Sequence, residues 1–294
     1  MNLLLQLLAN GLVNGTLFAV LAVGFGLVWR TTNVFHVAYG GLYVGCAYCF
    51  HILVARLGTP VWCGLLLTVA LAGLAGALIE IGFYRPFYRK QTSAGAVLIA
   101  SLGLFVTLEN MIALGFGNEL QTLTRATAPA LQLGLVMLTQ LQIVQFVAGV
   151  SVIGVFWLLV RRIPIFKAFW AIGDQPELIS ALGLPLFRLR ALVFAISTIL
   201  VAVPAALITL DLGADPHMGM SYLLVAAVSV LVGGRDSYCG WVGGAVLLAL
   251  LQSLVVWKFS ARWIDLVTFG LLVQILIFRP NGLFVRQRRV EEAT

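Results

Sequence analysis

The most constraining feature of this sequence is a succession of apolar runs, most of them long enough to cross a lipid bilayer. Nine runs fall at 3–29, 33–54, 60–84, 94–116, 137–160, 188–210, 218–233, 240–257 and 263–278. A membrane-spanning helix needs about 20 mostly apolar residues. We therefore predict an all-α, polytopic integral membrane protein with about eight to ten transmembrane helices. Residues 1–294 are expected to form a single transmembrane domain, in which the short run 218–233 crosses the membrane either fully or halfway.

Composition excludes the soluble globular class. Hydrophobic residues make up 61% of the chain and charged residues only 10%, whereas soluble domains carry about 25% charged residues. With so few charges, the net charge of +7 indicates a topological bias of Lys and Arg toward the cytoplasm. We do not expect a nucleic-acid partner. The expected surroundings are a lipid bilayer.

The distribution of Lys and Arg predicts the orientation. The first run has no basic residue before Arg30, which is unlike a secretory signal peptide, because such a peptide begins with positive charge. If the N-terminus is outside and the runs alternate, 14 basic residues lie inside and 4 outside, as the positive-inside rule favours. The inner set is Arg30, Arg85, Arg89, Lys90, Arg161, Arg162, Lys167, Arg188, Arg190, Arg235, Arg279, Arg286, Arg288 and Arg289, and the outer set is Arg56, Arg125, Lys258 and Arg262. The C-terminus is then cytoplasmic.

Two connecting segments are longer than the rest. Residues 117–136, predicted outside, are mixed in composition and contain Pro129, which suits a surface loop. Residues 161–187, predicted inside, contain a candidate amphipathic helix. Asp174 is an expected N-cap with Glu177 three residues later, and Gly183 suits the C-terminal cap. Its apolar side chains have no evident cover within the chain, so a partner is expected to bury them: Phe169, Trp170, Ile172, Leu178, Ile179 and Leu182.

The chain lacks the motifs of an enzyme. None of its three lysines lies in the Gly-Lys-Ser/Thr of a phosphate-binding loop, so any ATP is expected to bind to another chain and no cofactor to this one. Cys46 and Cys49 form an isolated pair inside an apolar run, which favours helix packing over metal or redox chemistry. We expect no catalytic and no metal-binding residues.

Polar residues gather in the second run. His36, Tyr39 and Gly40 are expected to share a helix face, as are Tyr39 and Tyr43, beside close-packing glycines, and Asn33 belongs to the same polar cluster. Such a face suits the pathway of a small polar solute, and an interior histidine with interfacial tyrosines is the equally acceptable alternative.

Two acidic residues lie near or within apolar runs. Glu80 precedes Arg85 by about one turn, which favours a structural ion pair over a proton relay. Glu109, next to Asn110, leaves both interpretations open.

Five stretches of the sequence carry a resemblance to a known family. They are GLVNGTLFAVLAVGFGLVWRTTNVFHVAYGGLY at 11–43, GALIEIGFYRPFYRK at 76–90, FWAIGDQPELISALGLP at 169–185, VSVLVGGRDSYCGWVGGAVL at 228–247 and LIFRPNGLF at 276–284. In this order they resemble the permease subunit of ABC importers for branched-chain amino acids, within a broader group that includes urea and short-amide importers. The resemblance implies the ABC importer permease fold and a bacterial inner-membrane location.

The resemblance also implies partners and a coupling segment. The partners are a second permease subunit, homologous or identical, two cytoplasmic ATPases and a periplasmic solute-binding protein. The segment at about 165–185 resembles the part that docks on the ATPase. The positions that it assigns to coupling are Trp170, Ala171, Gly173, Asp174, Glu177 and Gly183.

Two other classes compete with this interpretation. A secondary transporter working alone predicts inverted repeats and ion ligands at mid-membrane, yet no convincing repeat is visible. A membrane-embedded enzyme predicts a nucleophile with its base or a set of metal ligands, and neither is evident. A small amino acid is the best-supported solute, followed by urea or an amide.

Overall fold

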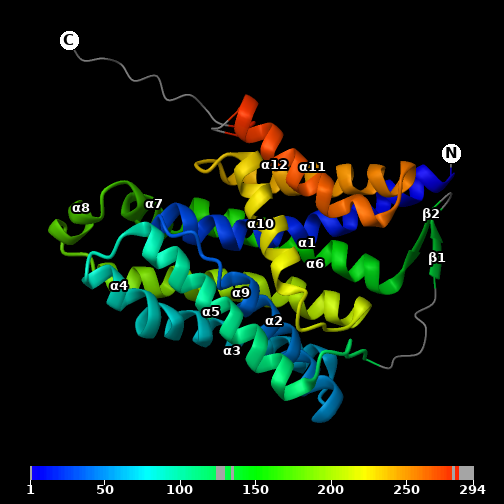
Figure 1. Cartoon of the computed structure of the whole chain (residues 1–294), viewed down its shortest axis with the longest axis horizontal. Coiled ribbons are helices and arrows are strands. Elements are labelled where there is room, and N and C mark those ends of the chain that lie inside the picture. The colour runs from blue at the N-terminus through cyan, green and yellow to red at the C-terminus, as the bar shows by residue number, and fades with distance from the viewer. Residues whose placement is uncertain (1, 124–129, 134–135, 280–281, 285–294) are drawn as a thin grey trace.

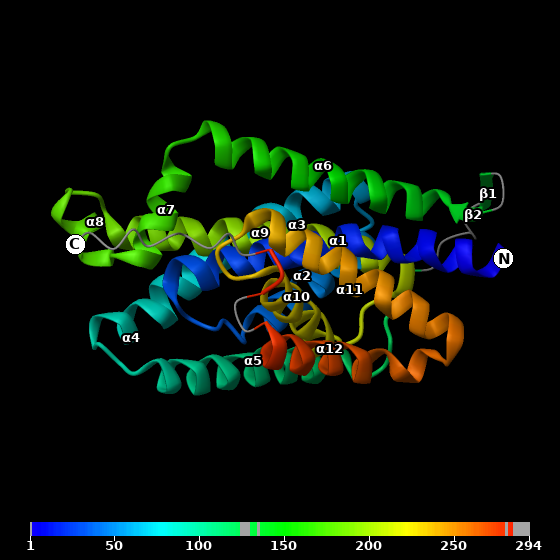
Figure 2. The ribbon, with the colours of Figure 1, turned by 90° about the horizontal axis from the view of Figure 1, so that it is seen from above.

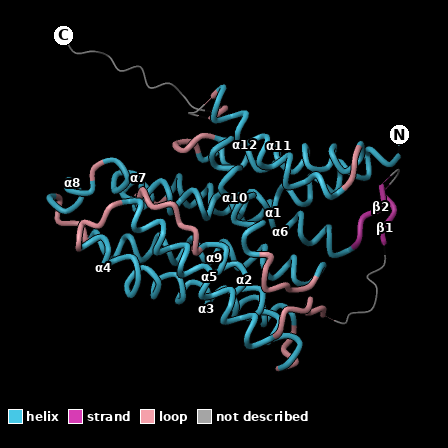
Figure 3. The backbone as a smooth tube through the Cα atoms, viewed as in Figure 1, coloured by secondary structure: helices cyan, strands magenta, loops and turns pink. Residues whose placement is uncertain are grey.

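The computed structural model describes residues 2–123, 130–133, 136–279 and 282–284. Its helices are α1 (Asn2–Thr32), α2 (Tyr39–His51), α3 (Val61–Ile79), α4 (Arg85–Arg89), α5 (Ala94–Phe116), α6 (Gln140–Arg162), α7 (Ile165–Asp174), α8 (Pro176–Ala181), α9 (Leu186–Leu212), α10 (Gly219–Gly233), α11 (Tyr238–Lys258) and α12 (Ile264–Phe278). π-Helical turns follow α2 (Ile52–Arg56) and α3 (Glu80–Tyr84), and a short 3₁₀ helix (Ala261–Trp263) precedes α12. Figure 3 shows that most of the described chain is helical.

Every predicted apolar run contains a helix, so the all-α membrane class is confirmed. Seven helices of the described chain are long and apolar enough to cross a membrane; one of them runs through α3, the π-helical turn and α4. The helix α10 has 15 residues, or about 22 Å at 1.5 Å per residue, against a hydrocarbon core of about 30 Å. The second run gives the shorter α2, preceded by residues 33–38, which form no helix.

Two helices form the centre of the bundle. Most of α1 and α9 is buried, whereas α5, α6 and α12 expose most of their apolar surface. In Figure 2, α6 lies on one side of these central helices, and α5 with α12 lies on the opposite side. Apolar surface on the outer helices is what a lipid environment requires, since lipid tails are as apolar as the side chains that face them.

Local capping explains where several helices begin. Ser93 caps α5 by accepting a hydrogen bond from the Ala96 N–H. Thr139 and Gln142 form a reciprocal capping box at the start of α6, and the Ser237 hydroxyl accepts from the Gly240 N–H at the start of α11. Each cap satisfies a backbone donor that has no partner inside the helix.

The segment predicted as a surface loop contains a small hairpin. Strands β1 (Ala130–Leu133) and β2 (Val136–Thr139) pair antiparallel, beside the N-terminal end of α1 (Figure 1). The Gln6 side chain exchanges two hydrogen bonds with the Met137 backbone, at 2.6 and 2.7 Å. Pro129 lies outside the described residues.

The connections separate into two ends of the bundle. At one end, Arg30 pairs with Asp174 and Asp236, and the Arg85 guanidinium lies over the Phe187 ring. These residues come from segments predicted on the same side of the membrane.

The opposite end joins segments predicted on the other side. Gln121 and Ala214 exchange backbone hydrogen bonds, and Arg56 lies over the Phe116 ring. The connections therefore lie at the two ends of the bundle in the order that the sequence predicted.

Candidate functional site

The segment between α6 and α9 forms two short helices instead of one. The helix α7 ends at Asp174, and α8 begins at Pro176 after a break at Gln175. The prediction that Asp174 caps the N-terminus of a helix with Glu177 is therefore wrong. Gly183 does occupy the expected C-terminal cap of α8, with φ +74° and the Leu184 N–H donating to the Ile179 carbonyl at 3.2 Å.

The expectation that the apolar side chains of this segment lack cover within the chain is wrong for most of them. Phe169, Ile172 and Ile179 are at most 3% exposed. The half-buried Trp170 ring lies 5.8 Å from the Trp241 ring. The apolar face of α7 turns toward the bundle, so the exposed side chains come from its opposite face and from α8. Among these exposed residues are Asp174, Gln175, Glu177 and Leu182, and the Leu178 side chain lies outside the described part of the structure.

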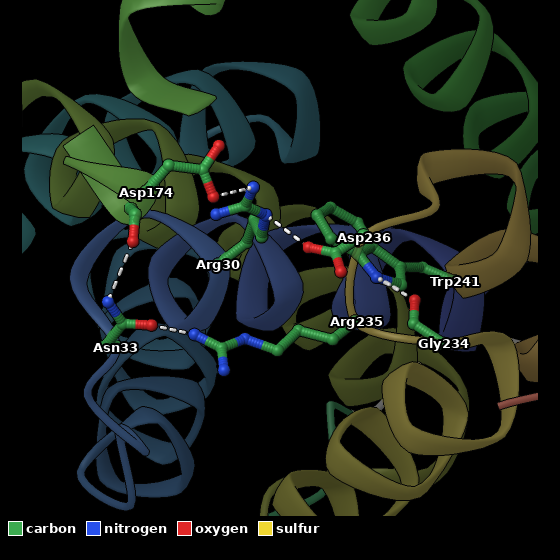
Figure 4. Close-up of polar contacts among 8 residues, drawn as sticks. Arg30, Asn33, Asp174, Gly234, Arg235, Asp236 and Trp241 are labelled. Atoms are coloured by element: carbon green, nitrogen blue, oxygen red, sulfur yellow. Dashed lines mark hydrogen bonds and ion pairs between the residues drawn. The ribbon is translucent and has the colours of Figure 1, made fainter. Parts of the chain in front are cut away.

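Arg30, at the end of α1, holds this segment to the bundle (Figure 4). Its Nη2 atom lies 2.7 Å from Oδ1 of Asp174, and its Nε atom lies 2.6 Å from Oδ1 of Asp236, in the α10–α11 connection. The Arg30 side chain is only 7% exposed. A buried guanidinium requires such partners, because an unpaired charge away from water is costly. One α1 residue therefore joins two separate connections.

Asn33 makes a second link between the same segments. Its amide nitrogen donates to the Gly173 carbonyl at 3.0 Å, and its amide oxygen accepts from Arg235. The backbone of Asn33 has φ +56°, the left-handed region that asparagine tolerates better than most residues. A Cβ atom at Gly173 would lie 2.0 Å from the Arg30 carbonyl oxygen, so glycine is required where α7 meets α1.

The residues predicted to share a face of the second run do not all lie on a helix. His36 precedes α2, which begins at Tyr39. His36 is 1% exposed, and its Nδ1 atom lies 2.6 Å from the Tyr84 hydroxyl. That hydroxyl lies 2.6 Å from the Ser101 hydroxyl of α5, which accepts from the Ala38 N–H at 3.0 Å. A continuous polar chain therefore joins the start of α2 to the π-helical turn and α5.

The other residues of this set are packed between helices. The Tyr39 hydroxyl donates to the Leu21 carbonyl of α1 at 2.6 Å. A Cβ atom at Gly40 would lie 2.6 Å from the Gly219 carbonyl oxygen of α10, and the Tyr43 ring stacks on Tyr222 with centroids 4.3 Å apart. Within this chain, the face is therefore covered by α1, α5 and α10.

Glu80 forms the expected ion pair, but with another partner. Its Oε1 atom lies 2.7 Å from Nε of Arg190 on α9, and both side chains are at most 2% exposed. Glu80 opens the π-helical turn that also contains Tyr84, and both residues are buried. The predicted partner, Arg85, lies instead over Phe187 with its guanidinium carbon 4.4 Å from the ring centroid.

Glu109 pairs with a residue that the sequence did not single out. Its Oε1 atom lies 2.5 Å from Nδ1 of His217, in the α9–α10 connection. The neighbouring Asn110 donates to the Val106 carbonyl at 2.7 Å within α5. On the exposed surface of α5, Gly95 and Gly103 have open space around a built Cβ. The described part of the chain therefore leaves α5 uncovered at these two positions.

Fold and site together define a polytopic helical membrane protein with a polar anchoring cluster at one end. The chain belongs to the family of permease components of branched-chain amino acid transport systems, whose model matches residues 7–276.

Individual relatives agree with this family. The chain is 26% identical to the high-affinity branched-chain amino acid transport system permease protein BraD of Pseudomonas aeruginosa. It is 25% identical to the corresponding LivH protein of Escherichia coli K12, and in both comparisons 96% of each chain is covered. The ribose import permease protein RbsC of Haemophilus influenzae is 23% identical, over 74% of this chain and 67% of RbsC.

A solved structure shows a related fold. The structure described as PsaBC from Streptococcus pneumoniae in complex with Fab matches with a TM-score of 0.52. The match covers 92% of this chain and 91% of the other at 13% identity, so it bears on the fold alone.

Proposed function

We propose that this permease carries small amino acids, branched-chain ones first among them, through the inner membrane of a bacterium. The observation that carries the proposal is the extent of the relationship, since BraD and LivH each align over 96% of both chains. The ribose permease aligns over less of its length, which favours an amino acid over a sugar. The permease works by alternating access without covalent chemistry and binds no cofactor itself.

In the proposed assembly, the second permease subunit is homologous or identical to this one. That subunit faces this one, two cytoplasmic ATPases bind and hydrolyse ATP, and a periplasmic binding protein delivers the solute. The bundle end that carries Arg30 faces the cytoplasm, because the basic residues of the described chain concentrate there. The N-terminus then lies outside and the C-terminus inside.

The proposed coupling site is the pair of helices α7 and α8. Glu177 and Gly183 lie on the exposed α8 side, where an ATPase subunit can bind. Trp170, Gly173 and Asp174 connect α7 to the bundle, through the Trp170–Trp241 ring contact, the close packing at Gly173 and the Arg30–Asp174 ion pair. The partly buried Ala171 packs against the hydrophobic core. A movement imposed on α8 is thereby passed to the end of α1.

The proposed pathway runs along α5, with the second-run residues as its support. Asn33 receives the movement of α7 through the Gly173 carbonyl. His36 and Ala38 pass it to α5 through Tyr84 and Ser101, while Tyr39, Gly40 and Tyr43 pack the layer behind. Residues 33–38 are not helical, so they can change conformation at lower cost than a helix.

Reconstitution tests the proposal. The chain is to be co-expressed with the ATPases and second permease of the same importer, placed in liposomes, and supplied with ATP and the importer's binding protein. We expect uptake of radiolabelled L-leucine that depends on ATP and on the binding protein. Uptake of urea or acetamide without leucine would overturn the substrate, and uptake driven by an ion gradient without ATPases would overturn the importer.

A further inference from the structure

A cavity lined by both polar and apolar side chains opens to the surface of this chain, away from the coupling cluster. It has a volume of about 230 Å³ and lies between α1, α10, α11 and α12. Its polar lining is formed by Asn14, Ser221, Tyr222, Gln252, Asp265 and Thr268, and its apolar lining includes Phe18, Leu224, Ile264 and Phe269. The volume is below the 300–1,000 Å³ typical of sites for drug-sized ligands, so it suits a smaller solute.

The polar groups are arranged from a buried floor to an open rim. Gln252 and Thr268 are 8% and 4% exposed, and the Gln252 amide donates to the Thr268 hydroxyl at 2.8 Å. Asn14, Ser221 and Asp265 are exposed at the rim, and among the described residues none of their side chains has a hydrogen-bond or ion-pair partner. Their polar atoms are therefore available to a ligand.

The one charged side chain that lines the cavity is a carboxylate, which favours a ligand with a positively charged group. Asp265 is the single charged residue in its described lining, and neither Lys258 nor Arg262, the basic residues near it in sequence, belongs to that lining. Phe18, Tyr222 and Phe269 add aromatic rings, whose faces attract cations. One carboxylate without histidine or cysteine is a poor set of metal ligands. Hydroxyl and amide groups beside an apolar wall fit an organic compound with an ammonium group instead.

We propose that this cavity binds a compound with a primary ammonium group and a short apolar part. The ammonium pairs with Asp265, the polar remainder meets Asn14, Ser221 and the Gln252–Thr268 floor, and the apolar part lies against Phe18 and Phe269. A free α-amino acid and the ethanolamine headgroup of a phospholipid both supply this chemistry. Only the choice of an amino acid as natural ligand rests on the proposed function.

The cavity is connected to the second run. Tyr222 lines the cavity and stacks on Tyr43, and Phe18 meets Tyr222 edge-on with centroids 6.5 Å apart. A ligand that displaces Tyr222 would therefore also move the packing around Tyr43.

Equilibrium binding to the purified full-length chain in phosphatidylcholine nanodiscs tests the site. The probes are radiolabelled L-leucine and ethanolamine, with N-acetyl-L-leucine as the analogue that lacks the ammonium. We expect both amines to bind, N-acetyl-L-leucine to fail, and Asp265→Asn to weaken binding at least tenfold. Glu119→Gln removes an exposed carboxylate outside the cavity and is expected to bind as wild type. Ser221→Ala, a mild change at the rim, is expected to weaken binding several-fold. It provides a second test of the site in case Asp265→Asn does not fold.

Each result has a defined meaning. Loss of leucine binding in nanodiscs that contain phosphatidylethanolamine would identify the headgroup as the natural occupant, and unchanged binding would identify a free amine. Absence of amine binding, equal binding of N-acetyl-L-leucine, or wild-type affinity in Asp265→Asn would overturn the site. Leucine uptake by the reconstituted importer is measured separately, so failure of the cavity and failure of the proposed substrate give different results.

Discussion

At the scale of single residues, the buried charges of this chain are held by partners from distant segments. Glu80 and Arg190 are 110 residues apart in sequence yet pair inside the bundle. A buried ion pair often contributes little net stability, but removing one partner leaves an unpaired buried charge and is costly. The pair is therefore best tested by removing one of the two charges.

Glu80→Gln is therefore expected to destabilise the chain more than removal of both charges. The single variant leaves Arg190 charged and buried, which typically costs about 3–5 kcal/mol. The double variant Glu80→Gln with Arg190→Met leaves no unpaired charge. Thermal unfolding of the detergent-solubilised protein should give the order wild type, double variant, single variant. A single variant as stable as wild type would show that Arg190 finds another partner.

Gly40 lies at a close approach of α2 and α10. Gly40→Leu is expected to abolish leucine uptake, because the side chain would meet the Gly219 backbone where a Cβ atom alone lies 2.6 Å away. Gly45→Leu is the matched control, since no atom lies within 4 Å of a Cβ built there. Uptake by liposomes and binding of the ATPases are measured together. Normal uptake by Gly40→Leu would show that this contact yields without consequence.

At the scale of elements, the proposed coupling segment is an anchored part of the bundle and not a free amphipathic helix. Most of its apolar residues pack inward, and the surface around α8 that we propose for ATPase binding exposes Asp174, Gln175 and Glu177 beside Leu182 and Leu184. Arg30, through Asp174, fixes the position of that surface. Loss of this anchor should affect coupling more than binding.

Asp174→Asn is accordingly expected to uncouple transport from ATP hydrolysis. The neutral amide loses the charge of the 2.7 Å pair with Arg30, although Asp236 still holds the guanidinium. We expect the ATPases to co-purify normally, while leucine taken up per ATP hydrolysed falls several-fold. Glu177→Gln, which neutralises a carboxylate on the exposed side of α8, serves as the comparison and should weaken ATPase binding instead. Unchanged stoichiometry in Asp174→Asn would argue against the ion pair as a link.

A harsher change should break the segment as a whole. Gly173→Pro with Glu177→Lys places a ring where a Cβ atom already lies 2.0 Å from the Arg30 carbonyl and reverses a charge on α8. We expect the chain to insert in the membrane but to lose ATPase co-purification and transport together. Undiminished ATPase binding with normal uptake would contradict the coupling assignment.

At the scale of the whole molecule, the two ends of the bundle differ in charge and in contacts. The proposed orientation can be tested by labelling a cysteine-free variant in intact cells with a membrane-impermeant maleimide. Glu119→Cys, between α5 and β1, should react from outside, whereas Lys90→Cys, after α4, should react only in permeabilised cells. Both positions are exposed, so access depends on the side of the membrane. The reverse result would invert the topology, including that of Thr294, which lies outside the described residues.

Sequence alone determined the class of protein and the approximate position of its long helices. The nine apolar runs became helices because hydropathy and helix length are local properties that a bilayer enforces on any chain. The five stretches that carried the family resemblance, and the helix cap at Gly183, likewise depend on residues close together in sequence.

Only the tertiary structure decided which side chains meet. It paired Glu80 with Arg190 instead of Arg85, turned Phe169 and Ile172 inward, and gave Asp174 to Arg30 where a local cap was expected. It also assembled the cavity around Asp265 from four helices. Each of these outcomes depends on what lies across a helix interface. An apolar run in a membrane protein carries little information about how its helix is rotated about its axis, because lipid and protein neighbours are equally apolar.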